Sequence, residues 1–433
     1  MNRLVEQRNE GVVDSNALAG ELRGKIRGDV RFDAGSRALY ATDGSNYREV
    51  PIGVVLPRDV EDVTQTILTA RRHGAPILSR GCGTSLAGQC CNVAVVMDMT
   101  KYFHEFIAID PQKRLATARP GIVLDDFRAH AEKYGLTFGP DPATHNRCTI
   151  GGMIGNNSCG VHSVMAQFAG TGARTSDNLD ALEILTYDGR RMRVGKTSEE
   201  ELGSIIRNGG PRAEIYRKLK GLRDKYAPLI RERYPKIPRR VSGYNLDDLL
   251  PENGFHVARA LAGSEGTCVT ILEATLQLIP NPKARTLLVL GYPDVFAAGD
   301  HCPKIMRHQP IGLEDFDDEM VHLMKEHQLH PDELKLLPEG RGWLMVEFGG
   351  ASKEQADDRA RELMAALENN GRAPAMKLYD DKASEKKLWE VRESALGATA
   401  FAQGKPDRWP GWEDSAVPPD RVPFFRTPRI ILV

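Results

Sequence analysis

The sequence lacks several features that define whole classes of protein. No apolar run approaches the roughly 20 residues that a membrane-spanning helix needs. The first ten residues are too polar and too mixed in charge for a signal peptide. The charges also balance, because 58 Lys and Arg stand against 59 Asp and Glu, for a formal net charge of −1. We therefore expect no transmembrane segment and no nucleic-acid partner.

Paired cysteines are missing as well. Seven cysteines among 433 residues are an odd number, and none belongs to a CxxC pair. This usage is typical of free thiols in a reducing compartment, so we predict a cytoplasmic protein. It also disfavours an iron–sulfur cluster or a structural zinc held by this chain, and we predict no metal site in it.

What the chain does have is length, a core-forming composition and glycine. Its length suggests about two to four domains. The hydrophobic fraction of 41% is that of a globular protein with a sizeable core. Glycine is in excess, with 41 residues, or about 9% of the chain against roughly 7% on average. This indicates tight turns or close approach of the backbone to a ligand.

Strands and helices alternate in the first half. Ile52–Leu56 is an apolar strand run, Val60–His73 has helical spacing with Gly74 directly after it, and Val93–Met97 is a continuous apolar strand. An Asp-Gly turn between Leu182–Tyr187 and Arg190–Val194 predicts a β-hairpin.

The pattern changes after Pro282. Strand runs at Thr286–Gly291, Gly342–Phe348 and Ala375–Tyr379 alternate with amphipathic helices at Lys353–Asn369 and Ala383–Phe401. This alternation predicts a separate α+β domain that packs its helices on one sheet face.

The first Gly-rich segment, 79–89, directly follows a predicted strand. It is not a dinucleotide fingerprint, because Leu86 stands at the third glycine position, and not a P-loop, because Gln89 replaces the lysine. Successive backbone N–H groups in such a turn can bind a phosphate, and we favour this interpretation over a purely structural turn.

The second Gly-rich segment lies within residues 140–180, which lack periodicity and are predicted as a long loop, either functional or disordered. It comprises 139–142 and Thr149–Gly160 and carries few large side chains, as close passage of a ligand requires. The third segment, Gly263–Thr267, is a weak turn signal by itself.

In this order and spacing, the three segments resemble flavoproteins of the vanillyl-alcohol oxidase/p-cresol methylhydroxylase type. The resemblance covers about residues 40–282 and implies an α+β fold. That fold is a two-subdomain FAD-binding domain followed by a ferredoxin-like α+β substrate domain, here expected to be incomplete. We place a lead segment at 1–46, the FAD-binding domain at 47–282 and the partial second domain at 283–433.

The resemblance implies that the three segments bind FAD, through residues that we take from each in turn. The first supplies Arg80, Gly81, Cys82, Gly83, Thr84, Ser85, Gly88 and Gln89. The second supplies Pro140, Asp141, Thr149, Gly151, Gly152, Asn156, Asn157, Ser158 and Gly160. The third supplies Gly263, Glu265, Gly266 and Thr267. Since 79–89 holds no histidine, the usual covalent link is missing and we predict noncovalent FAD.

Two further stretches, Asp43–Tyr47 and Arg239–Asn245, resemble one subgroup, the FAD-linked D-lactate and D-2-hydroxyglutarate dehydrogenases that are often fused to a C-terminal iron–sulfur half. The implied reaction oxidises a D-2-hydroxy acid to the 2-oxo acid and passes electrons to a quinone, a cytochrome or an electron carrier. The alternatives are a flavin-binding subunit or fragment without catalysis of its own, which awaits an iron–sulfur partner, and a sugar or alcohol oxidoreductase on the same fold.

The resemblance suggests one substrate residue and no catalytic one. Arg392 matches the arginine that binds the substrate carboxylate in such enzymes, although an exposed helix charge is an equally good interpretation. The family pattern is lost after Arg421, and we expect a truncated product, with any iron–sulfur clusters in the missing half.

Overall fold

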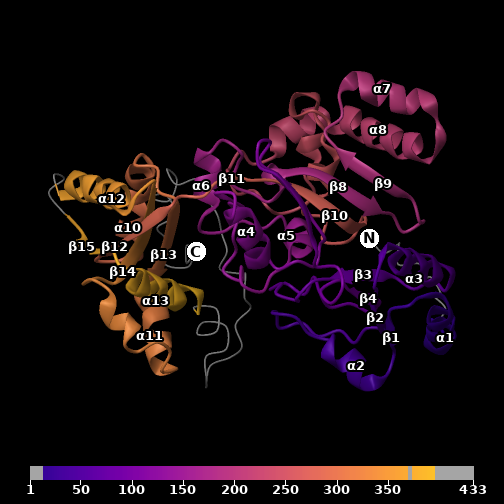
Figure 1. Ribbon diagram of the computed structural model, residues 1–433, viewed down its shortest axis with the longest axis horizontal. Coiled ribbons are helices and arrows are strands. Elements are labelled where there is room, and N and C mark those ends of the chain that lie inside the picture. Colours follow the sequence, from indigo (N-terminus) through magenta and orange to yellow (C-terminus); the bar gives the residue numbers. More distant parts are fainter. Residues whose placement is uncertain (1–12, 369–372, 395–433) are drawn as a thin grey trace, which may run out of the picture.

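Three sheets of four or five strands organise the chain in the computed structural model, which describes residues 13–368 and 373–394. Figure 1 shows them in sequence order, from the indigo N-terminal region on the right to the orange and yellow C-terminal region on the left. We call them the first subdomain (15–98), the second subdomain (106–280) and the C-terminal domain (284–393). Among the helices of the described residues, none combines the length and apolar character that a bilayer crossing requires.

The first subdomain is a small α/β layer. Strands β2, β4 and β3 run parallel, and β1 pairs with β2 as an antiparallel edge. All four residues of β4 are buried, which confirms the strand predicted from its apolar run. Its elements are α1 (Ser15–Lys25), β1 (Asp29–Arg31), α2 (Ala34–Leu39), β2 (Gly53–Leu56), α3 (Val60–Arg72), β3 (Ile77–Arg80) and β4 (Val95–Asp98).

Helix α3 begins and ends as its sequence predicts. The Asp59 carboxylate accepts the N–H of Asp62 at 2.9 Å at its start, and Gly74 follows its end with φ +67°. Leu18 and Leu22 of α1 pack in the same apolar core as Ile67 of α3. The described part of the predicted lead segment 1–46 is therefore built into this subdomain through α1 and β1.

The second subdomain is an antiparallel sheet in the order β5-β6-β10-β8-β9. The predicted hairpin is confirmed as β8 and β9, with Gly189 at φ +85° in the turn. Its elements are β5 (Phe106–Asp110), β6 (Leu115–Ala118), α4 (Leu124–Glu132), β7 (Leu136–Thr137), α5 (Ile150–Asn156), α6 (Ser163–Phe168), η1 (Ser176–Asn178), β8 (Leu179–Leu185), β9 (Arg191–Gly195), α7 (Glu199–Asn208), α8 (Gly210–Arg233), η2 (Leu246–Leu249), η3 (Pro251–Asn253), α9 (Val257–Leu261), β10 (Thr270–Gln277) and β11 (Ile279–Pro280).

The prediction of one long loop at 140–180 is wrong, because α5 and α6 lie within it. The Thr149 hydroxyl accepts the N–H of Gly152 at 3.2 Å and caps α5, and Asn157 ends that helix at φ +54°. Glycine has a poor helix propensity, so the glycines of α5 concealed the helix in the sequence.

The C-terminal domain is a four-stranded antiparallel sheet in the order β13-β14-β12-β15. With helices between β12 and β13 and between β14 and β15, this is the predicted ferredoxin-like topology. Its elements are β12 (Ala284–Tyr292), α10 (Val295–Met306), β13 (Gly312–Asp317), α11 (Asp318–Glu326), η4 (Glu333–Leu336), β14 (Gly342–Gly350), α12 (Lys353–Glu368), β15 (Ala375–Tyr379) and α13 (Lys382–Glu393).

Helices cover both faces of this sheet, so the prediction that they pack on one face is wrong. Leu288 and Val346 face the core shared with α10 and α12, whereas Val289 and Met345 face the core shared with α11 and α13. Every residue of β14 except the last is buried, as a strand covered on both sides requires. Of the helix predicted at Ala383–Phe401, α13 ends at Glu393, and residues from 395 onward lie outside the described residues.

Candidate functional site

The three Gly-rich segments, far apart in sequence, meet around one small cavity of about 90 Å³, which we call the glycine cavity. Gly81 lies against the second segment, because a Cβ added there would be 2.2 Å from the Thr149 hydroxyl. Glu265 donates its N–H to the Gly155 carbonyl at 3.0 Å, and the Gln89 amide donates to the Glu265 carboxylate at 3.2 Å. The segments therefore hold one another in place.

Ten of the 21 residues predicted to bind the cofactor line this cavity, which gathers residues from all three segments. They are Arg80, Gly81, Ser85, Gln89, Thr149, Gly151, Gly152, Asn156, Glu265 and Gly266. Two others line a second cavity instead, Asp141 and Gly160. The rest line neither cavity: Cys82, Gly83, Thr84, Gly88, Pro140, Asn157, Ser158, Gly263 and Thr267.

Some predicted residues support the loops that surround the cavity. The Arg80 guanidinium is buried and donates to the carbonyls of Thr42 at 2.8 Å and Cys90 at 2.9 Å. The start of the first segment is thereby connected to the residue that directly follows its end. Gly83 and Gly88 have φ of +70° and +81°, conformations that strongly favour glycine. These residues shape the turn whether or not they touch a ligand.

Gly155 provides an independent test of whether a ligand fits this cavity. A Cβ added there would meet no protein atom closer than 3.9 Å, so packing within the chain does not require glycine. Gly155 nevertheless lies in the last turn of α5 and lines the cavity. A glycine that weakens its helix without a packing reason is expected where a ligand passes close to the backbone. The cavity therefore fits a cofactor that passes close to this end of α5.

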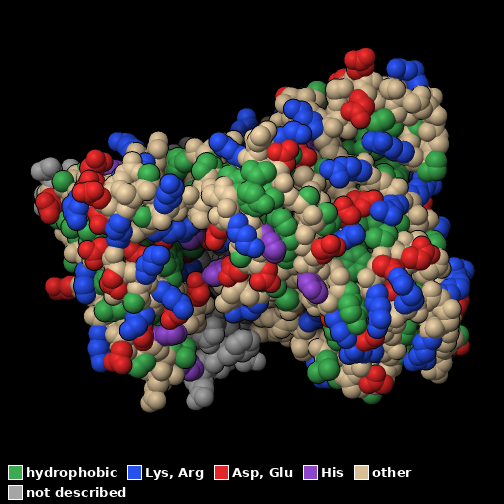
Figure 2. Space-filling model, in the orientation of Figure 1, with side chains coloured by type: hydrophobic (Ala, Val, Ile, Leu, Met, Phe, Trp, Pro, Cys, Tyr) green, Lys and Arg blue, Asp and Glu red, His purple; other side chains and the backbone are tan. Residues whose placement is uncertain are grey.

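A much larger cavity, of about 1560 Å³, lies between the second subdomain and the C-terminal domain. We call it the interdomain cavity. The second Gly-rich segment connects the two cavities, because Gly155 and Asn156 line the small one and Cys159 and Gly160 line the large one. Figure 2 shows a recess between the two lobes, with histidine and acidic side chains gathered around it.

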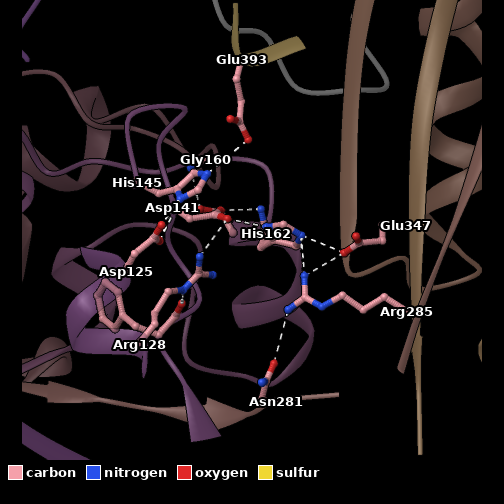
Figure 3. A network of polar contacts seen from close by, with 12 residues as sticks. Asp125, Arg128, Asp141, His145, Gly160, His162, Asn281, Arg285, Glu347 and Glu393 are labelled. Carbon is pink, nitrogen blue, oxygen red and sulfur yellow. Dashed lines mark hydrogen bonds and ion pairs between the residues drawn. The ribbon is translucent and has the colours of Figure 1, made fainter. Parts of the chain in front are cut away.

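Five charged side chains form one chain of contacts across this cavity (Figure 3). His162 lies between the carboxylates of Asp141, which it contacts through Nδ1, and Glu347, whose Oε2 is 2.8 Å from Nε2. Arg128 lies 3.4 Å from Asp141, and Arg285 lies 2.9 Å from Glu347. Arg128, Asp141 and His162 belong to the second subdomain, whereas Arg285 and Glu347 belong to the C-terminal domain. The network therefore joins the two.

Within this network, oppositely charged neighbours favour the ionised form of each titratable group. Burial opposes ionisation of Asp141, but His162 and Arg128 lower its pKa to about 2. Burial likewise opposes ionisation of Glu347, but Arg285 and His162 lower its pKa to about 2. Burial disfavours the imidazolium of His162, and the two carboxylates outweigh that effect and raise its pKa. The two carboxylates thus favour the protonated form of His162.

A second histidine makes a similar bridge at the same cavity (Figure 3). His145 Nδ1 is 2.8 Å and 2.9 Å from the two carboxylate oxygens of Asp125 on α4, and its Nε2 is 3.2 Å from Glu393 at the end of α13. The hydrogen bonds to Asp125 and then to Glu393 raise the pKa of His145 to about 9. With this pKa, His145 is protonated at neutral pH.

Arg392, the predicted substrate residue, lines the interdomain cavity from α13. Its side chain is 18% exposed, and one guanidinium nitrogen is 2.5 Å from the Glu314 carboxylate on β13. The alternative of an exposed helix charge is therefore wrong. A guanidinium has five N–H donors, so Arg392 can keep Glu314 and bind a further carboxylate.

Sequence reasoning did not single out the charged residues that make the contacts described above: Asp125, Arg128, His145, His162, Arg285, Glu314, Glu347 and Glu393. One of them did carry a signal. Glu347 is a lone charge within the apolar run of β14, and an ionised group in a strand covered on both faces must have a partner. No pattern in the sequence indicated that its partners would be Arg285 and His162.

Two families match separate parts of the chain. Residues 51–195 match the FAD binding domain, and residues 281–426 match the C-terminal domain of FAD linked oxidases. The second match continues past Arg421, where the sequence analysis placed the loss of the family pattern. A D-2-hydroxyglutarate dehydrogenase of Pantoea ananatis is 28% identical over 404 residues, which are 89% of this chain and 39% of that protein.

Other relatives differ in how much of their length is covered. The glycolate oxidase subunit GlcD of Bacillus subtilis is 25% identical over 89% of this chain and 69% of that subunit. A p-cresol methylhydroxylase structure superposes with a TM-score of 0.59 at 13% identity, over 90% of this chain and 73% of that one. The predicted fold and resemblance are confirmed. The chain spans 39% of the length of the D-2-hydroxyglutarate dehydrogenase that it matches.

Proposed function

We propose that this chain, which joins a FAD binding domain to the C-terminal domain of FAD linked oxidases, oxidises a D-2-hydroxy acid to the 2-oxo acid. The observation that carries the proposal is that one Gly-rich segment lines both the glycine cavity and the interdomain cavity, where Arg392 lies. Cofactor and substrate could then meet along that segment. Relatives named D-2-hydroxyglutarate dehydrogenase support this substrate class.

In this proposal the glycine cavity binds part of FAD, which passes close to the backbone of Gly81, Gly151 and Gly152 and to the side chain of Ser85. When bound, FAD supplies the acceptor for the hydride that leaves the carbon bearing the hydroxyl. We propose noncovalent binding, because the first segment has no histidine and Cys82 does not line the cavity. Denatured protein should release all its flavin; fluorescence that stays with the polypeptide would contradict this.

At the interdomain cavity, Arg392 binds the substrate carboxylate and fixes the orientation of the hydroxyl-bearing carbon. His145 is not a general base in this scheme, because its pKa of about 9 keeps it protonated at neutral pH. His162 is already in contact with the carboxylates of Asp141 and Glu347. We assign no catalytic base among the described residues.

Anaerobic titration of the FAD-loaded protein tests this function. D-2-hydroxyglutarate or D-lactate should bleach the flavin absorbance, and their L-isomers should not. Replacing Arg392 by Met together with Glu314 by Gln avoids leaving a buried carboxylate unpaired. This double variant should lose about a hundredfold in kcat/KM and keep its affinity for FAD. A flavin that no 2-hydroxy acid bleaches would contradict the proposal.

A second candidate is a flavin-binding subunit that acts only with a partner. Coverage of 69% of a glycolate oxidase subunit favours it, since that relative is itself named as a subunit. The electron acceptor would be a quinone, a cytochrome or an electron carrier, reached through a partner with iron–sulfur clusters. Bleaching by substrate without turnover on added quinone or electron carrier would favour this candidate.

We also propose a cytoplasmic location. No disulfide joins any of the seven cysteines in the structure, although Cys90 and Cys91 are neighbours in sequence. Free thiols are typical of a reducing compartment. Labelling of the thiols in intact cells with a permeant reagent, compared with an impermeant one, tests this location.

A further inference from the structure

We propose that His145, through its contact with Glu393, is a positioning residue that holds Arg392 at the interdomain cavity. The inference rests on the proposed function, because the role of Arg392 in binding a carboxylate belongs to that function. It assigns His145, a residue of the second subdomain, a role in the substrate affinity of the C-terminal domain.

The first step is the geometry of the end of α13. Glu393 directly follows Arg392, and consecutive residues on a helix point about 100° apart. Arg392 reaches Glu314 on β13 of its own domain at 2.5 Å, while Glu393 reaches His145 of the second subdomain at 3.2 Å. The last turn of α13 is thus held from two sides, and both contacts fix the backbone that carries Arg392.

The second step is that His145 is already oriented before it meets Glu393. Both oxygens of the Asp125 carboxylate lie within 2.9 Å of Nδ1, which fixes the ring and directs Nε2 across the cavity (Figure 3). Asp125 belongs to α4, a helix of the second subdomain packed through Leu124 and Phe127 into its main core. The bridge therefore connects α13 to a rigid element.

The third step is that the other bridge holds a different element. His162 contacts Glu347 on β14, in the middle of the C-terminal sheet, and both side chains are nearly buried. That contact fixes where the sheet lies. His145 and Glu393, with 27% and 31% of their side chains exposed, instead lie at the helix end next to Arg392. Loss of this bridge should move one helix turn and leave the sheet in place.

Kinetics of matched variants test the proposal. His145→Asn and Glu393→Gln should each raise KM for the hydroxy acid about tenfold, with kcat within about twofold and the Kd for FAD unchanged. The matched control is Glu390→Gln, which makes the same change on α13 but has Lys386 of the same helix as its partner, at 3.6 Å. It should keep the wild-type KM.

The double variant His145→Asn/Glu393→Gln should be no worse than the poorer single variant, because both remove the same contact. His145→Gln has a longer side chain, which brings its amide N–H donor closer to Glu393 than that of asparagine, and should recover part of the affinity. Additive effects, or single variants that behave like Glu390→Gln, would overturn the proposal. If His145→Asn does not fold, the same comparison is made with His145→Gln and Glu393→Gln.

A second measurement separates this inference from the proposed function. If wild-type protein is not bleached by any 2-hydroxy acid, the proposed function fails, but the bridge can still be measured by amide hydrogen exchange. Exchange at 388–394 should be faster in His145→Asn and Glu393→Gln than in wild type and Glu390→Gln. Equal exchange in all four proteins would overturn the positioning role.

Discussion

The glycine cavity and the interdomain cavity are built in opposite ways. The first is lined by residues of three Gly-rich segments, among them five glycines, and its shape depends on the side chains that these glycines lack. The second is lined by paired charges such as His162 with Glu347 and His145 with Glu393, brought together from two domains. A backbone site is thus specified locally, whereas a side-chain site is specified only when the domains dock.

The largest expected effect comes from a substitution that disrupts the glycine cavity alone. Gly81→Val adds a side chain whose Cβ would lie 2.2 Å from the Thr149 hydroxyl, so the first and second segments must separate. We expect the Kd for FAD to rise at least about a hundredfold. Flavin fluorescence titration measures this Kd. Gly20→Val on the exposed face of α1, where a Cβ meets nothing within 4 Å, is the control. Wild-type affinity in Gly81→Val would contradict the cavity as the FAD site.

The next largest effect comes from a substitution that weakens the contact between the second subdomain and the C-terminal domain at the interdomain cavity. His162→Asn leaves the carboxylates of Asp141 and Glu347, each about 5% exposed, with fewer partners. Removing one member of such a buried network costs about 3–5 kcal/mol in the free energy of unfolding. Urea denaturation measures it.

A matched control for that variant lies on the surface. His322 is 3.2 Å from Glu326, but the two side chains are 60% and 48% exposed. Exposed pairs contribute less than about 1 kcal/mol, so His322→Asn should be nearly neutral. Equal losses in the two variants would show that the buried network has no special weight.

A smaller effect would sharpen the distinction between stability and ligand binding in the first region. Gly155→Ala adds a Cβ in the last turn of α5, where the nearest atom from outside the helix is the Glu265 Cα at 3.9 Å. Alanine should keep or slightly raise the free energy of unfolding, by up to about 1 kcal/mol, because it favours the helix. The Kd for FAD should rise about fivefold, since the methyl group faces the cavity. Reduced stability with unchanged FAD affinity would contradict this assignment.

The smallest effect concerns pH and the second region. The pKa of His145 is raised from 6.5 to about 9 by Asp125 and Glu393. A raised folded-state pKa stabilises fully below about 6.5, and the stabilisation is lost as the pH rises through about 9. The free energy of unfolding should therefore fall between pH 7 and 10 more steeply in wild type than in His145→Gln. Parallel pH profiles would contradict the bridge.

Much of the fold could be predicted because its signals are local. The α3 helix, the β8–β9 hairpin and β15 at Ala375–Tyr379 occur where periodicity and turn residues indicated them. Helix α5 could not be predicted, because its glycines argue against a helix and only the Thr149 cap and tertiary packing form it. The second helix layer of the C-terminal domain was also missed, since the sequence does not indicate which sheet face a helix covers.

The sequence by itself determined the backbone site, because the glycines that define it lie in short segments whose spacing can be recognised. It also singled out Arg392, through the family resemblance. Only the tertiary structure decided which charged side chains pair at the interdomain cavity, since the bridges from His162 to Glu347 and from His145 to Glu393 join residues 185 and 248 positions apart. Charge pairing depends on distances of a few ångströms, and those distances exist only after the domains have packed together.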